Sequence, residues 1–179
     1  TYNLPVVERL LQDAGGKALY LFPLKALEQD QLKAFREFVQ PFQTPFPFQA
    51  EIYDGDTSSY RRRKIRELVP PVLISNPDMV HFGLLPFHAQ WEGFFRNLKF
   101  VVIDELHTYK GIFGSHLTQI LRRLERVCDF YGAIPQIIAC SATIANPQAF
   151  AEKLTGLPFE AVTESGAPRS GRHFLFLNP

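Results

Sequence analysis

Short apolar runs that alternate with helical stretches constrain the fold of this 179-residue chain more than any other feature of its sequence. The runs at residues 18–22, 72–75 and 100–103 carry mostly apolar side chains at successive positions. Such continuous runs are typical of strands that are buried on both faces of a parallel sheet. The sequence therefore predicts an α/β fold, in which helices cover both faces of a parallel sheet.

The stretches between these runs show helical spacing. Leu4, Val7 and Leu10 recur at that spacing behind Pro5, and a glycine pair at residues 15–16 predicts the end of this first helix. Further helices are expected at residues 24–39 and 60–68, at about 115–131, and after Pro147; further strands are expected at residues 49–53, 136–140, 159–162 and 174–177. The stretch that holds His81, His88 and Trp91 is expected to be rich in loops, with its rings packed rather than used as ligands.

Composition and charge exclude several classes of protein. Apolar residues make up 46% of the chain, which favours one folded domain, while a net charge of +1 means that any nucleic-acid surface must come from local clusters of Lys and Arg. Cys128 and Cys140 form no CxxC pair, so neither a zinc site nor a disulfide scaffold is expected. No stretch approaches the roughly 20 apolar residues of a membrane span. We expect a soluble protein with no membrane partner, cytoplasmic in a bacterium or nuclear in a eukaryote.

Two acids and a histidine emerge directly from the apolar run at residues 100–103. At the carboxyl end of a strand, Asp104 can hold Mg²⁺ through water, and Glu105 can orient and deprotonate a water that attacks a γ-phosphate. His107 is expected to link this site to a neighbouring segment. The alternative is that Asp104 and Glu105 merely cap the turn that follows.

A second polar segment follows the run at residues 136–140 in the same way. Ser141 and Thr143 flank Ala142, and their hydroxyl groups can hydrogen-bond the carboxylates of a neighbouring strand. The alternative for this tripeptide alone is that Ser and Thr cap a helix, as they often do.

Together these two segments resemble motifs II and III of superfamily 2 helicases of the DExH type. The resemblance implies a RecA-like domain of the P-loop NTPase type, with ATP and Mg²⁺ as cofactors and a second RecA-like domain as partner. It also implies that Asp104, Glu105 and His107 form the catalytic site, with Asp104 toward the metal and Glu105 as the base. Ser141 and Thr143 would couple hydrolysis to motion.

Two further segments are similar to family motifs that run along the nucleic-acid backbone. Residues 22–31 resemble motif Ia and residues 74–79 resemble motif Ib, so Lys25, Ser75, Asn76 and Asp78 are candidate nucleic-acid-binding residues. The helix starts expected there would present free N–H groups to phosphates. Ordinary strand-to-helix turns are the alternative, with an Asn-Pro pair supplying the turn.

The densest basic cluster comprises Arg61, Arg62, Arg63, Lys64 and Arg66, beside Tyr60. A basic patch with an aromatic ring can grip phosphates and stack a base, so Arg61 and Arg62 are added to the nucleic-acid-binding candidates. A solvated helix face is the alternative here, and it is the expectation for the later arginines Arg122, Arg123 and Arg126.

Residues 107–116 and 53–57 narrow the resemblance, which covers nearly the whole chain. They are similar to the branch that contains the bacterial mitomycin-repair helicases and their fungal RecQ-related relatives, with Lhr-type helicases more distant. This branch implies an ATP-dependent helicase that acts in repair on DNA rather than RNA. An RNA helicase, a double-strand translocase and a noncatalytic nucleic-acid-binding module are the alternatives.

The Gly-rich phosphate loop of ATP-driven motors is missing from the sequence. Residues 15–18 lack the Ser or Thr that such a loop requires and join a helix to a strand. In the family, the loop precedes a segment that resembles residues 2–5, while residues 168–179 look like the strand that leads into the second domain. We therefore expect residues 1–179 to be a single RecA-like first domain that begins just after motif I, and expect the isolated fragment to be inactive as an ATPase.

Overall fold

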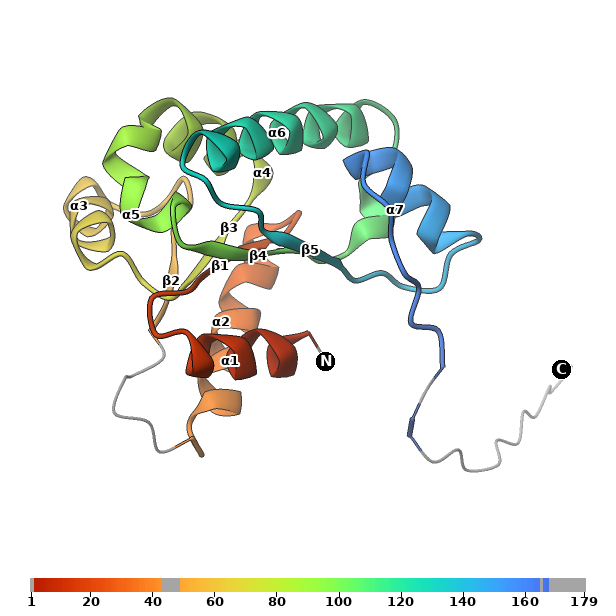
Figure 1. Cartoon of the computed structure of the whole chain (residues 1–179), viewed down its shortest axis with the longest axis horizontal. Coiled ribbons are helices and arrows are strands. Elements are labelled where there is room, and N and C mark those ends of the chain that lie inside the picture. The colour runs from red at the N-terminus through yellow and green to blue at the C-terminus, as the bar shows by residue number, and fades with distance from the viewer. Residues whose placement is uncertain (1, 43–48, 165, 168–179) are drawn as a thin grey trace, which may run out of the picture.

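The structure, a computed structural model, describes residues 2–42, 49–164 and 166–167. Its centre is a five-stranded parallel sheet in the order β2-β3-β1-β4-β5 (Figure 1). The strands are β1 (Lys17–Leu21), β2 (Ala50–Ile52), β3 (Val72–Ser75), β4 (Leu98–Ile103) and β5 (Gln136–Ala139). The parallel sheet that the apolar runs predict is confirmed.

The register brings the carboxyl ends of four strands to one edge of the sheet. Leu21 at the end of β1 lies between Ser75 of β3 and Ile103 of β4, and Ile103 in turn lies opposite Ala139 of β5. The segments that follow these strands must therefore start side by side, which is where an open parallel sheet binds its ligands.

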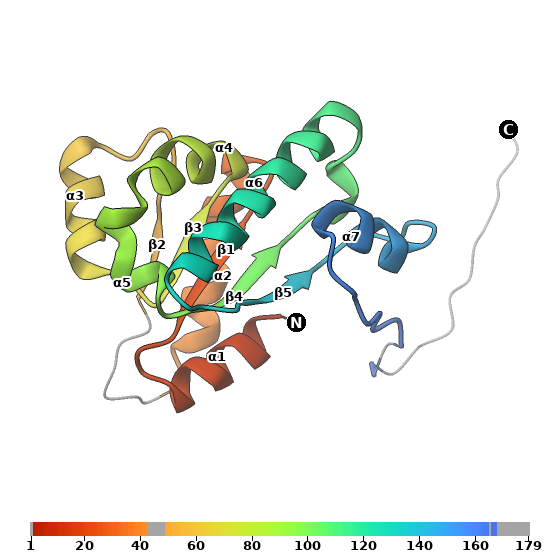
Figure 2. The same cartoon turned by 45° about the horizontal axis from the view of Figure 1, so that its top comes forward.

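Helices cover both faces of the sheet. The helices α1 (Asn3–Gln12) and α2 (Lys25–Val39) lie on the lower face in Figure 1 and bury one set of alternating strand residues. The opposite face packs against α6 (Gly111–Phe130), which Figure 2 shows lying across the sheet, and against α7 (Pro147–Thr155). Two separate apolar cores result, one on each side of the sheet.

Helix α6 begins four residues before the expected start at Ser115. Gly111 has a φ of +56°, and a Cβ at Gly114 would lie 2.4 Å from the carbonyl oxygen of Tyr109. The first turn therefore needs glycine both for its backbone angle and for close packing. These two glycines made the turn resemble a loop in the sequence.

The stretch expected to be loop-rich is mostly helical. It contains the short turn α4 (Pro77–Met79), a π-helical turn η1 (Val80–Leu84), a 3₁₀ segment η2 (Leu85–Trp91) and the turn α5 (Glu92–Phe95). The changes of pitch erase the 3.6-residue periodicity by which a helix is predicted. The expected packing is found for Trp91, whose buried ring meets that of Tyr53 edge to face, with 5.0 Å between centroids.

The expected strand at residues 159–162 is wrong. Phe159 is held by side chains of α7 instead: Gln148 Nε2 donates to its carbonyl, and its amide donates to Glu152. Val162 is almost fully exposed, and residues 160–164 have no strand conformation. The strand expected at residues 174–177 and the linker at residues 168–179 lie outside the described residues. Among the helices that the structure describes, none is long and apolar enough to cross a membrane.

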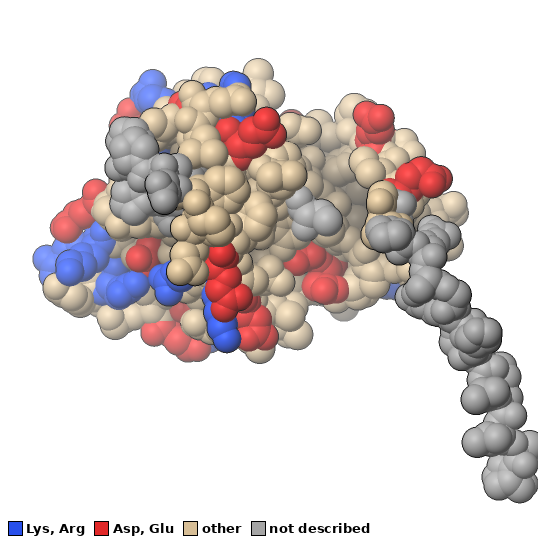
Figure 3. Space-filling view, turned by 90° about the horizontal axis from the view of Figure 1, so that it is seen from below, with Lys and Arg blue, Asp and Glu red and all other residues tan. Residues whose placement is uncertain are grey.

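The helix α3 (Ser59–Leu68) carries the dense basic cluster. Ser58 caps it by accepting from the Arg61 amide, and it ends at Val69 in a left-handed conformation. Its Ile65 joins the core on the α6 side of the sheet. Of its basic side chains, Arg61, Arg63 and Lys64 are exposed, whereas Arg62 and Arg66 are partly buried. Figure 3 shows Lys and Arg gathered at the left end of the molecule, where α3 lies in Figure 1.

Candidate functional site

The acidic segment begins where β4 ends. The Asp104 amide still donates to the Leu21 carbonyl, so this residue is fixed at the edge of the sheet. One oxygen of its half-buried carboxylate accepts from the Glu105 amide, at 2.9 Å, and the other accepts from the Tyr2 hydroxyl, also at 2.9 Å. Burial, followed by the Asp104 charge, raises the pKa of the Tyr2 hydroxyl, so Tyr2 stays a proton donor to this carboxylate.

Glu105 adopts a left-handed backbone conformation, with φ +51° and ψ +42°. Such a conformation is strained for a residue other than glycine and is common at functional sites. A short 3₁₀ turn, η3 (Leu106–Thr108), follows, and the Glu105 side chain makes no hydrogen bond that caps it. The alternative that Glu105 serves as a turn cap therefore finds no support in the contacts.

His107 joins the acidic segment to the segment after β5. Its Nε2 lies 3.2 Å from Glu105 Oε2, and its Nδ1 lies 3.2 Å from the Ala142 amide nitrogen, which donates to it. A ring nitrogen that accepts carries no proton, so in the neutral ring the proton is assigned to Nε2, which faces Glu105. The Leu106 amide donates to the Cys140 carbonyl and the Cys140 amide donates to the Ile103 carbonyl, and these two backbone hydrogen bonds hold the segments together.

The two hydroxyl residues do not contact the acids as expected. The Ser141 hydroxyl donates to the neighbouring Ala142 carbonyl, and the link to the acidic segment runs through the Ala142 amide instead. Ser141 and Thr143 are both exposed. The chain thus connects its second polar segment to Glu105 through a backbone group, which no side-chain pattern in the sequence encodes.

The residues present fit a magnesium ion that is bound mostly by water and phosphate. Within the described part of the chain, no group of three or more His, Cys, Asp or Glu side chains could enclose a metal ion. Each Asp104 oxygen accepts one hydrogen bond and keeps a further lone pair. Mg²⁺ at nucleotide sites commonly uses one or two carboxylates, several waters and the phosphates of the substrate.

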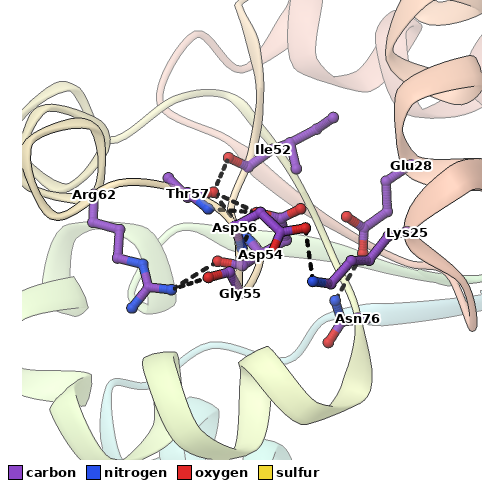
Figure 4. Close-up of polar contacts among 9 residues, drawn as sticks. All are labelled: Lys25, Glu28, Ile52, Asp54, Gly55, Asp56, Thr57, Arg62 and Asn76. Atoms are coloured by element: carbon purple, nitrogen blue, oxygen red, sulfur yellow. Dashed lines mark hydrogen bonds and ion pairs between the residues drawn. The ribbon is translucent and has the colours of Figure 1, made fainter.

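A second polar cluster links the starts of α2 and α4 (Figure 4). The Asn76 side chain accepts from the Met79 amide and donates to Glu28 Oε1, at 2.9 Å each. On the other side, Lys25 Nζ lies 2.8 Å from Asp56 in an exposed ion pair. The segments that resemble motifs Ia and Ib are therefore held together by side chains at the same sheet edge as Asp104.

Glu28 is fully buried in this cluster, which the sequence did not reveal. Burial raises the pKa of its carboxyl to about 7, while the hydrogen bond from Asn76 opposes that rise. Its second oxygen, Oε2, has no partner among the described residues. A glutamate in an amphipathic helix usually faces water, so nothing in the sequence distinguished this one from its exposed neighbours.

The loop between β2 and α3 closes on a buried aspartate. Asp54 Oδ1 accepts from the amides of Asp56 and Thr57 and from the Thr57 hydroxyl. From α3, the Arg62 guanidinium donates to the carbonyls of Asp54 and Gly55 (Figure 4). Arg62 therefore supports the loop from outside, and the loop lies beside Lys25.

The remaining nucleic-acid-binding candidates lie in different surroundings. Ser75 is fully buried and its hydroxyl donates to the Tyr53 carbonyl, so its side chain does not reach the surface as expected. Asp78 is exposed at the start of α4. Arg61 pairs with Glu51 beside a separate hollow of about 710 Å³, whereas Arg62 faces the loop. The basic cluster is thus divided between two sides of α3.

A family model described as DEAD/DEAH box helicase matches residues 1–150. The chain belongs to this helicase family. It is 49% identical to an uncharacterised ATP-dependent helicase, YprA, of Bacillus subtilis, over 99% of the chain and 23% of that protein. It is 40% identical to the ATP-dependent helicase HRQ1 of Saccharomyces cerevisiae, over 99% of the chain and 17% of that protein. The chain thus spans about a fifth of these relatives.

Solved helicase structures share the RecA-like fold of this chain. The helicase MrfA bound to DNA and AMPPNP superimposes with a TM-score of 0.88 at 49% identity, over 93% of this chain and 23% of that one. The helicase Lhr of Mycobacterium smegmatis bound to single-stranded DNA and AMP-PNP gives 0.65 at 28% identity, over 83% and 20%. The predicted placement near the mitomycin-repair and RecQ-related branch, with Lhr-type helicases more distant, is confirmed.

Proposed function

We propose that residues 1–179 form the first of two RecA-like motor domains of an ATP-dependent helicase that unwinds DNA in repair. Membership of the DEAD/DEAH box family supports ATP-driven action, and similarity to MrfA, which has been solved with DNA and AMPPNP, supports DNA over RNA. The second motor domain is part of this proposal, because the chain spans only about a fifth of its relatives.

The observation that best supports this function is the chain of contacts from Glu105 through His107 to Ala142, beside the Asp104 carboxylate. In the proposed reaction Glu105 takes the proton of the water that attacks the γ-phosphate. Asp104 would hold Mg²⁺ through water, and Tyr2 orients the Asp104 carboxylate by its hydrogen bond. Mg²⁺, when bound, neutralises the charge that develops on the phosphates.

Coupling to motion is assigned to His107 and to the segment from Ser141 to Thr143. Any shift of Glu105 during hydrolysis acts on His107, and through it on the Ala142 amide, because the imidazole contacts both. Ser141 and Thr143 are exposed beside this amide, where a second domain can contact them. The segment can therefore report the state of the nucleotide site without taking part in proton transfer.

The nucleic-acid grip is assigned to Lys25, the Asn76 turn and exposed Asp78, with Arg61 and Arg62 at the side. Lys25 supplies charge to a phosphate, and backbone N–H groups at the start of α4, beside Asn76 and Asp78, supply hydrogen bonds. Arg62 acts through the loop that it supports, and Arg61 is partly neutralised by Glu51. This grip is partial, so the affinity of the domain alone should be low and should fall with added salt.

The test is Glu105→Gln in the helicase that carries this chain. The amide keeps the shape of the side chain but cannot take a proton, so ATP turnover should fall roughly 100-fold or more while ATP binding survives. Glu125→Gln, at an exposed position of α6, is the matched control and should turn over ATP like the parent. Turnover by Glu105→Gln within a few-fold of the parent would refute the assignment of the base. Equal unwinding of DNA and RNA duplexes by the parent would refute the preference for DNA.

A further inference from the structure

A hollow of about 350 Å³ opens on the outer surface between α3 and the η1–η2 segment. One side of it is lined by Tyr53, which follows β2, and by the exposed rings of Phe82 in η1 and Phe87 in η2. The other side is lined by Arg62 and Arg66 of α3. Ligand pockets span roughly 300 to 1,000 Å³, so this hollow suits a single planar ring rather than a large ligand. No residue assigned to ATP hydrolysis above lines it.

The aromatic side of the hollow is left open to solvent. The side chains of Phe82 and Phe87 are 67% and 50% exposed, although both belong to a segment that otherwise buries its large apolar residues. Tyr53 is buried behind them, with its ring against Trp91. Two exposed phenyl rings beside one small hollow provide faces on which another planar ring can stack.

The basic side of the hollow is formed by Arg62 and Arg66 of α3. Within the described residues, neither Arg62 nor Arg66 forms an ion pair with a carboxylate, in contrast to Arg61 on the same helix. Arg62 lies 5.7 Å from the centre of the Tyr53 ring, and its buried Nε has no partner. Among the described residues, the Arg66 side chain makes only a long contact, of 3.5 Å, to the Tyr53 hydroxyl. The site therefore offers positive charge next to aromatic faces.

The hollow adjoins the proposed nucleic-acid grip across a single loop. Arg62 donates to the Gly55 carbonyl, and a Cβ built on Gly55 would lie only 3.4 Å from Lys25 Nζ. A strand whose phosphate lies at Lys25 would therefore meet the hollow on the other side of residues 54–57. Phosphates close to bases that stack on aromatic rings are the usual arrangement in single-strand binding.

We propose that this hollow receives one unstacked base of the bound nucleic-acid strand, against Phe82 and Phe87, with a neighbouring phosphate at Arg66. This inference rests on the proposed function, because it needs a strand at Lys25. The base is read by its π-face rather than by its hydrogen-bonding edge, so the hollow tolerates every sequence.

The test compares two oligonucleotides by fluorescence anisotropy with the helicase that carries this chain. One is a single-stranded oligothymidine, and the other has the same length with abasic residues in place of thymidines. Phe82→Ala and Phe87→Ala should each weaken binding of oligothymidine by about 5-fold or more, because a stacked base is lost, and should leave binding of the abasic strand unchanged. Both side chains are largely exposed, so the fold survives their truncation. Phe130→Ala, at a ring that is 74% exposed on α6, is the matched control and should bind like the parent.

The charged side is tested with Arg66→Gln against Arg63→Gln, an exposed neighbour outside the hollow. Arg66→Gln should weaken both oligonucleotides and reduce the salt dependence of binding, while Arg63→Gln should do neither. The base site would be overturned if the two phenylalanine variants weakened binding of the abasic strand as much as binding of oligothymidine. It would also be overturned if they weakened binding of neither strand. If Lys25→Gln still weakens binding, the proposed grip stands and only this inference fails. If the parent binds neither strand, both fail.

Discussion

Glu28 is the residue whose environment departs most from what its chemistry favours. A carboxylate without a partner for one oxygen is costly to bury, and proteins relieve the cost by protonation. The neighbouring Asp54 raises the pKa of Glu28 further, and Lys25 opposes that rise. The raised pKa, to about 7, means that the folded protein holds the proton of Glu28 far more tightly than the unfolded chain does.

Glu28→Gln should therefore stabilise the protein at high pH and not at low pH. Below the ordinary pKa of 4.5 the carboxyl is protonated in both states, and burial of the charge costs nothing. As the pH rises from 4.5 through 7, the unfolded state loses its proton first and the free energy of unfolding falls. At pH 8 the full penalty applies, so the variant should gain roughly 2 to 3 kcal/mol in urea denaturation.

Glu37→Gln, at an exposed position of the same helix, is the control and should follow the parent at every pH. Glutamine keeps an oxygen that can accept from Asn76, so the contact between α2 and α4 survives the substitution. A gain of the same size at pH 5 and pH 8 would show that Glu28 carries no raised pKa. No gain at either pH would show that its carboxylate is not buried at a cost.

The sequence predicted the residues at the strand ends and missed those that support them. Asp104 and Ser141 could be found because each follows an apolar strand, and the sheet brings the strand ends together. Tyr2 could not, because its contact with Asp104 joins residues 102 positions apart. Glu28 was missed because burial of a polar helix position depends on what packs over it, which no local pattern records.

At the scale of an element, the loop from Tyr53 to Thr57 is organised by one carboxylate. Asp54 is buried and accepts hydrogen bonds from two backbone amides and a hydroxyl within the loop. Arg62 then fixes the outer side of the loop by two carbonyl contacts. The loop separates Lys25 from the hollow on α3, so its shape sets the distance between the two proposed contacts of the strand.

Asp54→Ala should loosen this loop and weaken nucleic-acid binding together. Removing the buried carboxylate takes away the acceptor of two partly buried amides and one hydroxyl, so the free energy of unfolding should fall by roughly 1 to 3 kcal/mol. Hydrogen exchange at the amides of Asp56 and Thr57 should speed up. Urea denaturation measures the change in stability, and exchange mass spectrometry measures the change at these amides. Asp56→Ala removes only an exposed ion pair, so it should change stability by less than about 0.5 kcal/mol. Equal stability of the two variants would contradict the role given to Asp54.

The elements that the sequence missed share a physical cause. Helices and strands were predicted correctly where the spacing of apolar residues is regular, as in α2 and the middle of α6. The predictions failed where a glycine allows close packing, as at Gly114. They also failed where the helical pitch changes within a few residues, as in η1 and η2. Residues 159–162 have an apolar composition typical of a strand, but among the described residues they do not join the sheet.

At the scale of the whole molecule, basic and acidic residues nearly balance, so binding of nucleic acid must depend on where individual charges lie. The chain has 19 basic and 18 acidic residues, so no overall attraction draws in a polyanion. The exposed Lys25 at the proposed grip is paired with Asp56, which raises the pKa of the lysine through their hydrogen bond. A phosphate that binds Lys25 must compete with this carboxylate. We therefore expect Asp56 to lower the affinity of the proposed grip, although its exposed ion pair contributes little to the fold.

Asp56→Asn should strengthen binding of single-stranded DNA, and Lys25→Gln should weaken it. Without the Asp56 carboxylate, the Lys25 ammonium is free to bind a phosphate. The affinity for DNA should therefore rise a few-fold at low salt, and by less at high salt, where the ion pair is already screened. Lys25→Gln should also reduce the slope of log K against log salt by about one, because one phosphate contact is lost. Lys33→Gln, at an exposed position of the same helix, carries the same change in net charge and should alter neither quantity appreciably. Anisotropy titrations at several salt concentrations measure all three variants, and an equal effect of Lys25→Gln and Lys33→Gln would mean that the protein responds to overall charge rather than to a phosphate held at Lys25.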